Sequence, residues 1–300
     1  DTRFQISAQG STVQREIVAG VTTFLAMAYI IVVNPAILSE AGMDFGAVFV
    51  ATCIAAIVGT LLMALLANYP IGLAPGMGQN AFFTYGVVLG AGFSWQIGLG
   101  AVFLSGVAFL VLTVLPVREW LINAIPRNLK LGMAAGIGLF LAFIAMQNAG
   151  IVTDSPATLV AFGDLTEFAP VAALLGFVII AALTARRVRG AVIIGMLTVT
   201  VVGWLAGEAE FAGLMALPPS PAPVLLQLDI VGALEWSMVT IILSLLLVDV
   251  CATAGTLVGV ATRGGLVGRD GRLPRLRGAL FADSGATLIG SLAGTSSTTS

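Results

Sequence analysis

Long apolar runs, almost free of charged residues, recur along the chain and are separated by short polar connections. A helix needs about 20 mostly apolar residues to cross the hydrocarbon core of a bilayer, and many of these runs reach or approach that length. They are continuous rather than alternating, a pattern that favours membrane helices over the strands of a barrel. The pattern predicts an all-α, multi-span membrane protein with about nine spans, at residues 17–38, 45–66, 73–92, 95–115, 128–148, 170–185, 190–207, 236–261 and 278–293.

Two stretches are poorly suited to a continuous membrane helix. Residues 72–83 contain three glycines and a proline, and residues 290–300 read GSLAGTSSTTS. Glycine and proline interrupt helices, and non-helical backbone at membrane depth is tolerated only inside protein or beside a water-filled cavity. Paired interruptions of this kind point to the binding site of a transporter. The sequence therefore predicts two broken helices and an inverted repeat, which a short similarity between VGTL at 58–61 and IGSL at 289–292 also indicates.

Composition excludes several classes of protein. Of the 300 residues, 58% are apolar and 9% are charged, and the mean hydropathy is +1.06, whereas a soluble domain has about 25% charged residues. One large water-soluble core is therefore excluded. The chain has no histidine, which removes His-ligated zinc, the Ser-His-Asp triad and imidazole proton relays. A membrane-embedded enzyme is disfavoured for the same reason, and no metal or organic cofactor is expected.

Charged residues are distributed unequally between alternate loops. With the N-terminus in the cytoplasm, all 13 Lys and Arg residues fall in cytoplasmic segments. The opposite loops carry acidic residues and no Lys or Arg, as the positive-inside rule requires. We therefore expect a protein integral to the bacterial inner membrane with a cytoplasmic N-terminus. The proline-rich residues 217–223, in an outer loop, are predicted to form a stiff extended connector.

Two aspartates, Asp249 and Asp283, lie within the predicted spans. A carboxylate in hydrocarbon is costly, so such residues usually face a cavity or a partner. Thr253 and Thr256 follow Asp249 at i+4 and i+7 and share its helical face. This stripe indicates a site for a polar ligand or a coupling proton, with a structural hydrogen bond between helices as the alternative. For Asp283 the structural role is favoured.

The first interruption offers groups that suit a flat heterocycle. Its glycines would let a ring approach free main-chain N–H and C=O groups, and a half-helix that begins there would add a positive dipole end. Asn80 contributes an amide that both donates and accepts hydrogen bonds. Phe82 or Phe83 has the face on which a ring could stack, although packing in the core or against lipid is the favoured role.

Several sequence motifs occur together in a known family. Residues 27–38 read MAYIIVVNPAIL, residues 74–82 read APGMGQNAF, and the proline-rich loop continues to LQLD at 226–229. A further match is GTS at 294–296. With these motifs spread over the whole chain, the sequence resembles the AzgA-like branch of the nucleobase:cation symporter-2 family, the adenine/guanine/hypoxanthine permeases.

The resemblance implies fourteen spans in two inverted repeats of seven, divided into a core domain and a gate domain. Residues 1–115 would hold core spans 1 to 4, residues 116–233 gate spans 5 to 7, and residues 234–300 core spans 8 and 9 with the start of span 10. The chain would then be truncated within span 10, whose acidic residue would lie beyond Ser300. The implied substrate-binding residues are Gly76, Met77, Gly78, Asn80, Asp249, Thr253, Thr256, Gly294, Thr295 and Ser296.

One position departs from the family pattern. The eighth span of the family usually reads DxFDTxGTL, whereas residues 249–257 read DVCATAGTL. Asp249 keeps the first acid and is the proton-coupling candidate, but Ala252 stands where the second acid is usual. This departure leaves the substrate range and the proton coupling open.

The function implied by the resemblance is secondary active import of a purine-type nucleobase (adenine, guanine, hypoxanthine or xanthine) by proton symport. The alternative is a transporter of the same fold for uracil or for an anion such as sulfate or a dicarboxylate, and a channel is a more distant one. The expected partners are the nucleobase and membrane lipids, with a homodimer left open and no nucleic acid. The proton would be the coupling ion.

Overall fold

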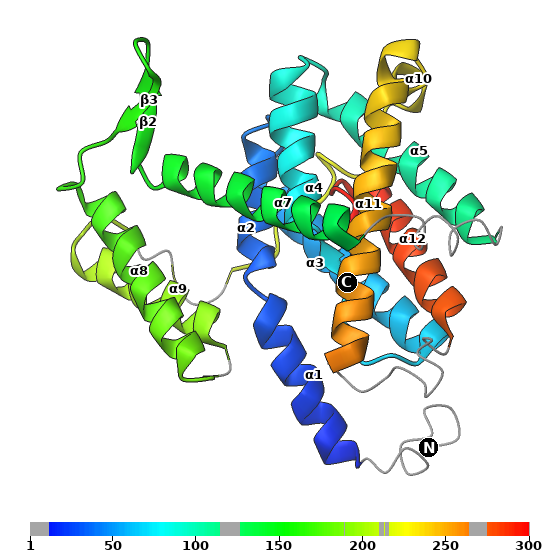
Figure 1. The fold of residues 1–300 in the computed structure, drawn as a ribbon, viewed down its shortest axis with the longest axis horizontal. Coiled ribbons are helices and arrows are strands. Elements are labelled where there is room, and N and C mark those ends of the chain that lie inside the picture. Colours follow the sequence, from blue (N-terminus) through cyan, green and yellow to red (C-terminus); the bar gives the residue numbers. More distant parts are fainter. Residues whose placement is uncertain are drawn as a thin grey trace. The chain divides into compact units, whose positions relative to one another are not determined.

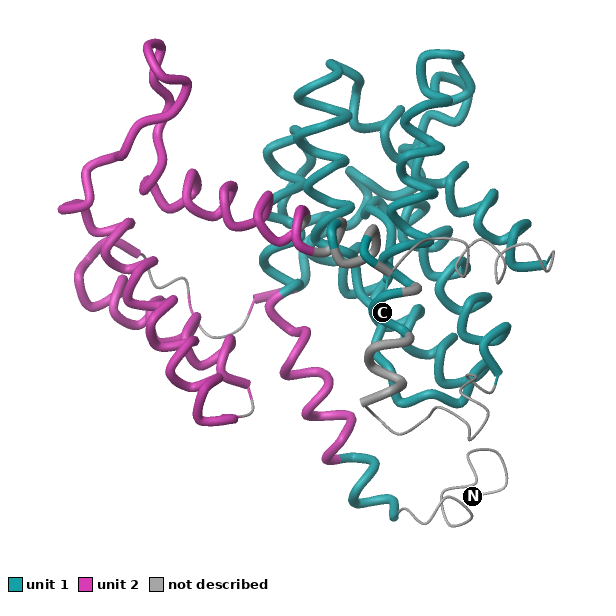
Figure 2. Tube along the Cα trace, viewed as in Figure 1, with its two compact units in different colours: residues 1–17, 30–134, 218–300 teal, residues 18–29, 135–217 magenta. Residues whose placement is uncertain are grey.

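The computed structural model of the chain describes residues 12–114, 127–188, 190–209, 213, 216–263 and 275–299. The chain divides into two compact units, coloured separately in Figure 2. Unit 1 comprises Asp1–Ile17, Ile30–Ala134 and Pro218–Ser300, and unit 2 comprises Val18–Tyr29 and Ala135–Leu217. The assignment of residues 1–115, 116–233 and 234–300 to core and gate domains stays a prediction.

Unit 1 is built from helices that pack around α12. Its helices are α2 (Ile30–Ser39), α3 (Phe45–Leu62), α4 (Met77–Ala81), α5 (Trp95–Val114), α10 (Ile230–Ala233), α11 (Trp236–Arg263) and α12 (Leu276–Ala293), with the π-helical segments η1 (Met63–Ala67) and η2 (Phe82–Gly90). Helix α12 packs against α3 and α5, and α11 also packs against α5 (Figure 1). The apolar core of this unit includes fully buried Leu38, Phe83, Leu99 and Met238. Because apolar faces of helices far apart in sequence share this core, α12 and α3 lie side by side.

Unit 2 contains a helix pair and a hairpin. Helices α8 (Phe168–Ala185) and α9 (Ala191–Leu205) pack together. The two helices approach closely at Gly195, where an added Cβ atom would lie 2.3 Å from Cγ1 of Ile180. Helices α1 (Val13–Met27) and α7 (Arg127–Asn148) each have residues in both units.

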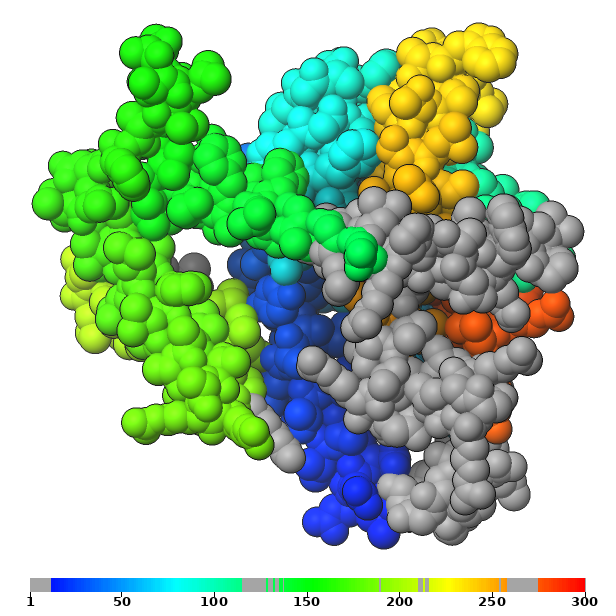
Figure 3. All heavy atoms as spheres, in the orientation of Figure 1, coloured from blue at the N-terminus to red at the C-terminus, as the bar shows by residue number. Residues whose placement is uncertain are grey.

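The helices lie where the apolar runs predict them. Helix α3 with η1 covers the predicted span at 45–66, and α5 covers the one at 95–115. Five helical stretches of the described residues are long and apolar enough to cross a membrane: Val13–Ser39, Phe45–Ala67, Trp95–Val114, Phe168–Ala185 and Trp236–Leu257. Helix α8, green in Figure 3, exposes Val171, Leu174 and Phe177, as expected of a surface that meets lipid. The count of nine spans and the inverted repeat stay predictions.

The connection between α7 and α8 differs from the all-α prediction. Strands β2 (Val152–Ser155) and β3 (Leu159–Phe162) form an antiparallel hairpin. At its turn the Thr158 hydroxyl donates to the Val160 carbonyl oxygen over 2.7 Å. Small polar side chains that bond to nearby backbone favour turns, so an outer loop can close into a hairpin that hydropathy does not reveal.

The proline-rich connector also differs from its prediction. Instead of continuing extended, the chain turns at Pro221, whose carbonyl oxygen accepts from the N–H groups of Val224 and Leu225 at 3.1 and 3.0 Å. The turn buries Val224 completely in the core of unit 1. Proline pre-sets a backbone angle suited to turns, and burial of Val224 stabilises this one. The prediction of a stiff extended segment is therefore wrong at this point.

Candidate functional site

The two predicted helix interruptions lie beside each other in unit 1. After η1 the chain leaves helical geometry, and strand β1 (Ala74–Pro75) pairs antiparallel with β4 (Thr298–Thr299), with Ala74 opposite Thr299. The N–H of Gly76 also donates to the Ser297 carbonyl oxygen over 3.0 Å. Unwound backbone away from water needs partners for its polar groups, and each interruption supplies some of them to the other.

Glycine is required at the start of α4 because of crowding. Gly76 is the N-cap residue of α4 in an extended conformation, and its carbonyl oxygen accepts from the N–H of Asn80 at 3.0 Å. A Cβ atom on Gly76 would lie 2.7 Å from Oε1 of Gln79 and 2.9 Å from Cγ2 of Thr299. A larger residue at this position would push apart side chains from the two interruptions. Met77 and Gly78 follow in the first turn of α4 and are half-buried.

At the second interruption the chain leaves α12 through Gly294. Gly294 ends the helix with φ of +94°, the left-handed region that favours glycine. A Cβ atom there would lie 2.5 Å from Cβ of Val224. The proline-rich turn is therefore packed directly on the point where α12 ends.

Asn80 is fully buried and links three segments of unit 1. Its amide nitrogen donates to Oδ1 of Asn34, and its own Oδ1 accepts from the Ser296 hydroxyl. Asn34, on α2, in turn donates to Oγ1 of Thr295 at 2.8 Å and to Oγ1 of Thr52 at 2.6 Å. An amide has two donor hydrogens and an oxygen with two lone pairs. The two bonds of Asn80 described here use one donor hydrogen and one lone pair.

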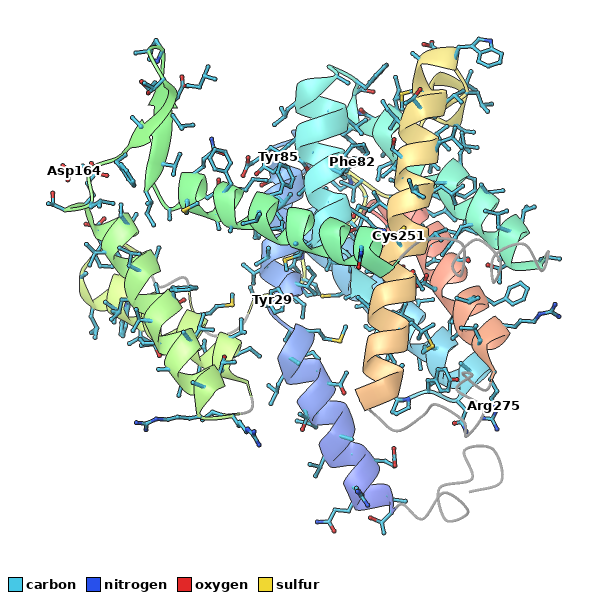
Figure 4. The ribbon with its side chains drawn as sticks, viewed as in Figure 1. Tyr29, Phe82, Tyr85, Asp164, Cys251 and Arg275 are labelled. Carbon is cyan, nitrogen blue, oxygen red and sulfur yellow. The ribbon has the colours of Figure 1, made fainter. Side chains whose placement is uncertain are left out.

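Asp249 joins α11 to both interruptions. Its side chain is 1% exposed, and its Oδ1 accepts from Nε2 of Gln79 at 2.6 Å and from the Ser297 hydroxyl at 3.0 Å. Figure 4 labels two neighbours of this site: Cys251, two residues after Asp249 on α11, and Phe82, two residues after Asn80. Such a carboxyl oxygen can accept these two hydrogen bonds whether or not the other oxygen of the group carries a proton.

The two threonines that follow Asp249 have different surroundings. Thr253 is fully buried, and its hydroxyl donates to Oδ2 of Asp283 on α12 over 2.6 Å. Thr256 is exposed, and its hydroxyl donates to the Ala252 carbonyl oxygen one turn earlier. The stripe predicted from the sequence is thus buried at Asp249 and Thr253 and exposed at Thr256. Asp283 has the interhelical hydrogen bond that its favoured structural role requires.

These hydrogen bonds form two sets, one of Asn34, Asn80, Thr295 and Ser296 and the other of Gln79, Asp249 and Ser297. The sets adjoin because residues 79 and 80, and residues 296 and 297, are neighbours in the chain, and we call the seven residues together the polar cluster. It contains four predicted site residues, Asn80, Asp249, Thr295 and Ser296, and adjoins Gly76 and Gly294. Their role in binding stays a prediction, as do those of Met77, Gly78, Thr253 and Thr256. Sequence reasoning missed Asn34, Gln79 and Ser297 as members of the site.

A signal for the missed residues is present in the sequence. Asn34 is an amide inside the first apolar run, and Gln79 lies in the glycine-rich interruption next to Asn80. Such polar side chains inside membrane segments are expensive unless they have partners, so each one is a candidate for the site.

An exposed polar contact lies outside the cluster: Tyr85, on η2, donates to Oε2 of Glu40 at 2.8 Å (Figure 4).

Comparison with known proteins gives consistent matches over nearly the whole chain. A family model described as "Permease family" (Xan_ur_permease) matches residues 14–300. The chain is 42% identical over 296 residues to adenine permease AdeP of Escherichia coli, covering 99% of this chain and 66% of that protein. It is 43% identical over 302 residues to guanine/hypoxanthine permease PbuO of Bacillus subtilis, covering 99% and 70%. It is 44% identical over 311 residues to PbuG of the same organism, also a guanine/hypoxanthine permease, covering 100% and 70%. The chain spans about two thirds of the length of AdeP.

Proposed function

The chain belongs to the permease family Xan_ur_permease, and on that premise we propose that it imports purine-type nucleobases by secondary active transport. The cargo class is adenine, guanine, hypoxanthine or xanthine, and the driving force is proton symport. The similarity to the adenine permease AdeP and the guanine/hypoxanthine permeases PbuO and PbuG supports a purine cargo. The protein is integral to a membrane, and we place it in the bacterial inner membrane with its N-terminus in the cytoplasm. No covalent step is required.

The observation that carries this proposal is the position of Asp249. One oxygen of its carboxyl group is held by Gln79 from the first interruption and by Ser297 from the second. A proton taken up by this group would alter the charge at the point where both unwound segments meet. Because charge on a buried carboxyl group is costly, a neutral guest that displaces water from it would favour uptake of the proton, and the proton would in turn favour the guest.

A neutral cargo fits the charges of the site better than an anion. The hydrogen bonds described above join amides, hydroxyls and one carboxyl group. An anion would approach the carboxyl group of Asp249, and repulsion between like charges is strong in a low-dielectric environment. The same-fold alternative for sulfate or a dicarboxylate is therefore the weaker one, whereas uracil shares the neutral planar chemistry.

Transport would follow an alternating-access scheme. In our proposal the inverted repeats of the fold place one interruption in each repeat, and the core moves against the gate to expose the cluster to each side in turn. The close packing of α3, α5 and α12 suits a core that moves as one body. The homodimer stays an open element of this proposal.

The test is uptake of radiolabelled adenine, guanine and hypoxanthine by the intact protein in cells that lack their own nucleobase permeases. We expect accumulation above the external concentration, collapse of that accumulation by a protonophore, and competition by unlabelled purines but not by sulfate. Competition by uracil alone would support the alternative cargo. Equilibration without accumulation would indicate a channel and would overturn the proposal.

A further inference from the structure

We propose that Gln79 is a specificity-determining residue whose carboxamide oxygen accepts a hydrogen bond from an N–H group of the transported base. The inference rests on the proposed function and adds to it the group that accepts a hydrogen bond from the base. Gln79 is 1% exposed and lies between Gly76 and Asp249, at the centre of the polar cluster.

The orientation of the Gln79 amide is fixed by its neighbour. Nε2 donates to Oδ1 of Asp249 at 2.6 Å, and the same Oδ1 accepts from the Ser297 hydroxyl at 3.0 Å. An oxygen that accepts two hydrogen bonds keeps accepting them when a proton resides on the other oxygen of the carboxyl group. The amide nitrogen therefore faces Asp249 in both protonation states, and Oε1 must face away from it.

Oε1 of Gln79 lies close to the backbone of Gly76. It is buried and has no hydrogen-bond partner among the described residues. The position that a Cβ atom of Gly76 would take lies 2.7 Å from this Oε1 and 2.9 Å from Cγ2 of Thr299. Oγ1 of Thr299 is likewise buried and without a partner in the described part of the chain. The side chains of Gln79 and Thr299 thus approach each other beside the backbone of Gly76, and each carries a buried polar atom without a partner among the described residues.

Buried polar atoms without partners are rare in folded proteins, and each requires an explanation. A ligand is the natural explanation for two such atoms in a site that already joins both interrupted segments. The acceptor Oε1 requires an N–H donor, and the hydroxyl can donate to or accept from the atom beside it. Amidine and lactam edges, in which an N–H adjoins a ring nitrogen or a carbonyl oxygen, have this pattern. Adenine, guanine and hypoxanthine all carry such an edge, whereas sulfate offers no donor.

A purely positioning role for Gln79 makes a different prediction. If Gln79 only held Asp249 in place, its replacement would weaken transport of every purine by a similar factor. If Oε1 binds an N–H of the cargo, the wild type should bind analogues without that N–H more weakly than the parent base. Replacement of Gln79 should then bring the two affinities close together. A site built to bond a donor rejects the analogue without it, because its buried acceptor is left unpaired.

The experiment compares wild type, Gln79→Met and the control Gln147→Met, which makes the same change at an exposed position of α7. Inhibition of labelled adenine uptake is measured for 6-methylpurine, 1-methylhypoxanthine and 9-methyladenine, each relative to its parent base. These analogues remove the donor at the exocyclic nitrogen, at N1 and at N9. We expect the wild type and the control to reject at least one analogue by about 5- to 100-fold. In Gln79→Met the same ratio should fall to about twofold or less.

Equal ratios in all three proteins would overturn the inference while leaving the proposed function intact. Failure of the wild type to accumulate any purine would instead refute the proposed function, and this inference with it. If Gln79→Met transports too slowly, the ratios are taken from displacement of labelled adenine bound to the purified protein, and Gln79→Leu serves as the second variant. The same two outcomes decide the inference in that assay.

Discussion

Asn34 and Thr295 are joined by a hydrogen bond of 2.8 Å although 261 residues separate them in sequence. Asn34 lies on α2, and Thr295 follows Gly294, the residue that ends α12. The amide of Asn34 thereby ties α2 to the second interruption, and through Asn80 to the first. Long-range contacts of this kind decide which helices meet, because apolar packing alone is not directional.

Replacement of Asn34 by leucine should destabilise the protein and reduce uptake. The change leaves buried polar groups of Asn80, Thr295 and Thr52 with fewer partners, at a cost of about 1–3 kcal/mol for each unsatisfied group. Thermal unfolding of the detergent-solubilised protein measures the effect. Asn148→Leu, an exposed site on α7, is the control, and equal melting temperatures of the two variants would contradict the role given to Asn34.

Asp249→Asn should uncouple transport from the proton gradient. Asparagine retains an oxygen that can accept from Gln79 or Ser297, so binding should survive, but it cannot take up a proton at this position. We expect accumulation of labelled adenine to fall to equality with the medium, while exchange of labelled for unlabelled adenine continues. The exposed Asp154→Asn in the hairpin is the matched control. Accumulation at the wild-type level in Asp249→Asn would remove this residue from the coupling mechanism.

The pair Thr253→Val and Thr256→Val separates a buried threonine from an exposed one on the same helix. Thr253 donates to the carboxyl group of Asp283 at 2.6 Å, and a buried polar group that loses its partner costs about 1–3 kcal/mol. Thr256→Val should change the free energy of unfolding by about 0.5 kcal/mol or less. Chemical or thermal unfolding checks both values, and Thr253→Ser should restore stability.

The same pair tests the predicted binding role of Thr256. If Thr256 contacts the cargo, Thr256→Val should slow purine uptake at unchanged stability. Unchanged uptake by this variant would restrict the site to the buried polar cluster and its immediate neighbours.

Gly294→Ala should be strongly destabilising for two reasons. Its φ of +94° is unfavourable for any residue with a Cβ atom, and that atom would lie 2.5 Å from Cβ of Val224. Overpacking and backbone strain of this type cost about 1–3 kcal/mol each. Val224→Ala should relieve only part of the loss, because the Cβ atom and the carbonyl oxygen of residue 224 would still lie 2.5 and 2.6 Å away. Gly20→Ala, which meets nothing within 4 Å, should leave the melting temperature unchanged or raise it.

The helices could be predicted from the sequence because lipid imposes a strong local rule. A span requires an unbroken apolar run, so the bounds of α5 and α12 agree with the predicted 95–115 and 278–293 within a few residues. The interruptions were predictable too, since Pro75 and Gly294 are incompatible with a continuous helix where they stand. Hydropathy gave no indication of the hairpin at 152–162, because turn formation depends on local polar contacts rather than on apolar periodicity.

The polar cluster could be predicted only in part. Asp249 and Asn80 are visible as polar residues in apolar surroundings, but the partner of each is set by tertiary packing. Gln79 and Asp249 are 170 residues apart in the chain, and no local pattern connects them. The turn at Pro221 shows the same limit, because burial of Val224 against the end of α12 depends on a helix that follows it in the sequence.

The pairing of the two interruptions has a consequence for biosynthesis. Ser296 follows Asn80 by 216 residues, so at about 5–20 residues per second a ribosome needs about 10–40 seconds to supply the second half of the site. During that interval the unwound segment before α4 is already made but lacks its β4 partner. The nascent chain must shelter these open backbone groups from lipid, either in the translocon or in a hydrated pocket among the early helices. The two halves of this site can therefore meet only after the segment that holds Ser296 has been translated.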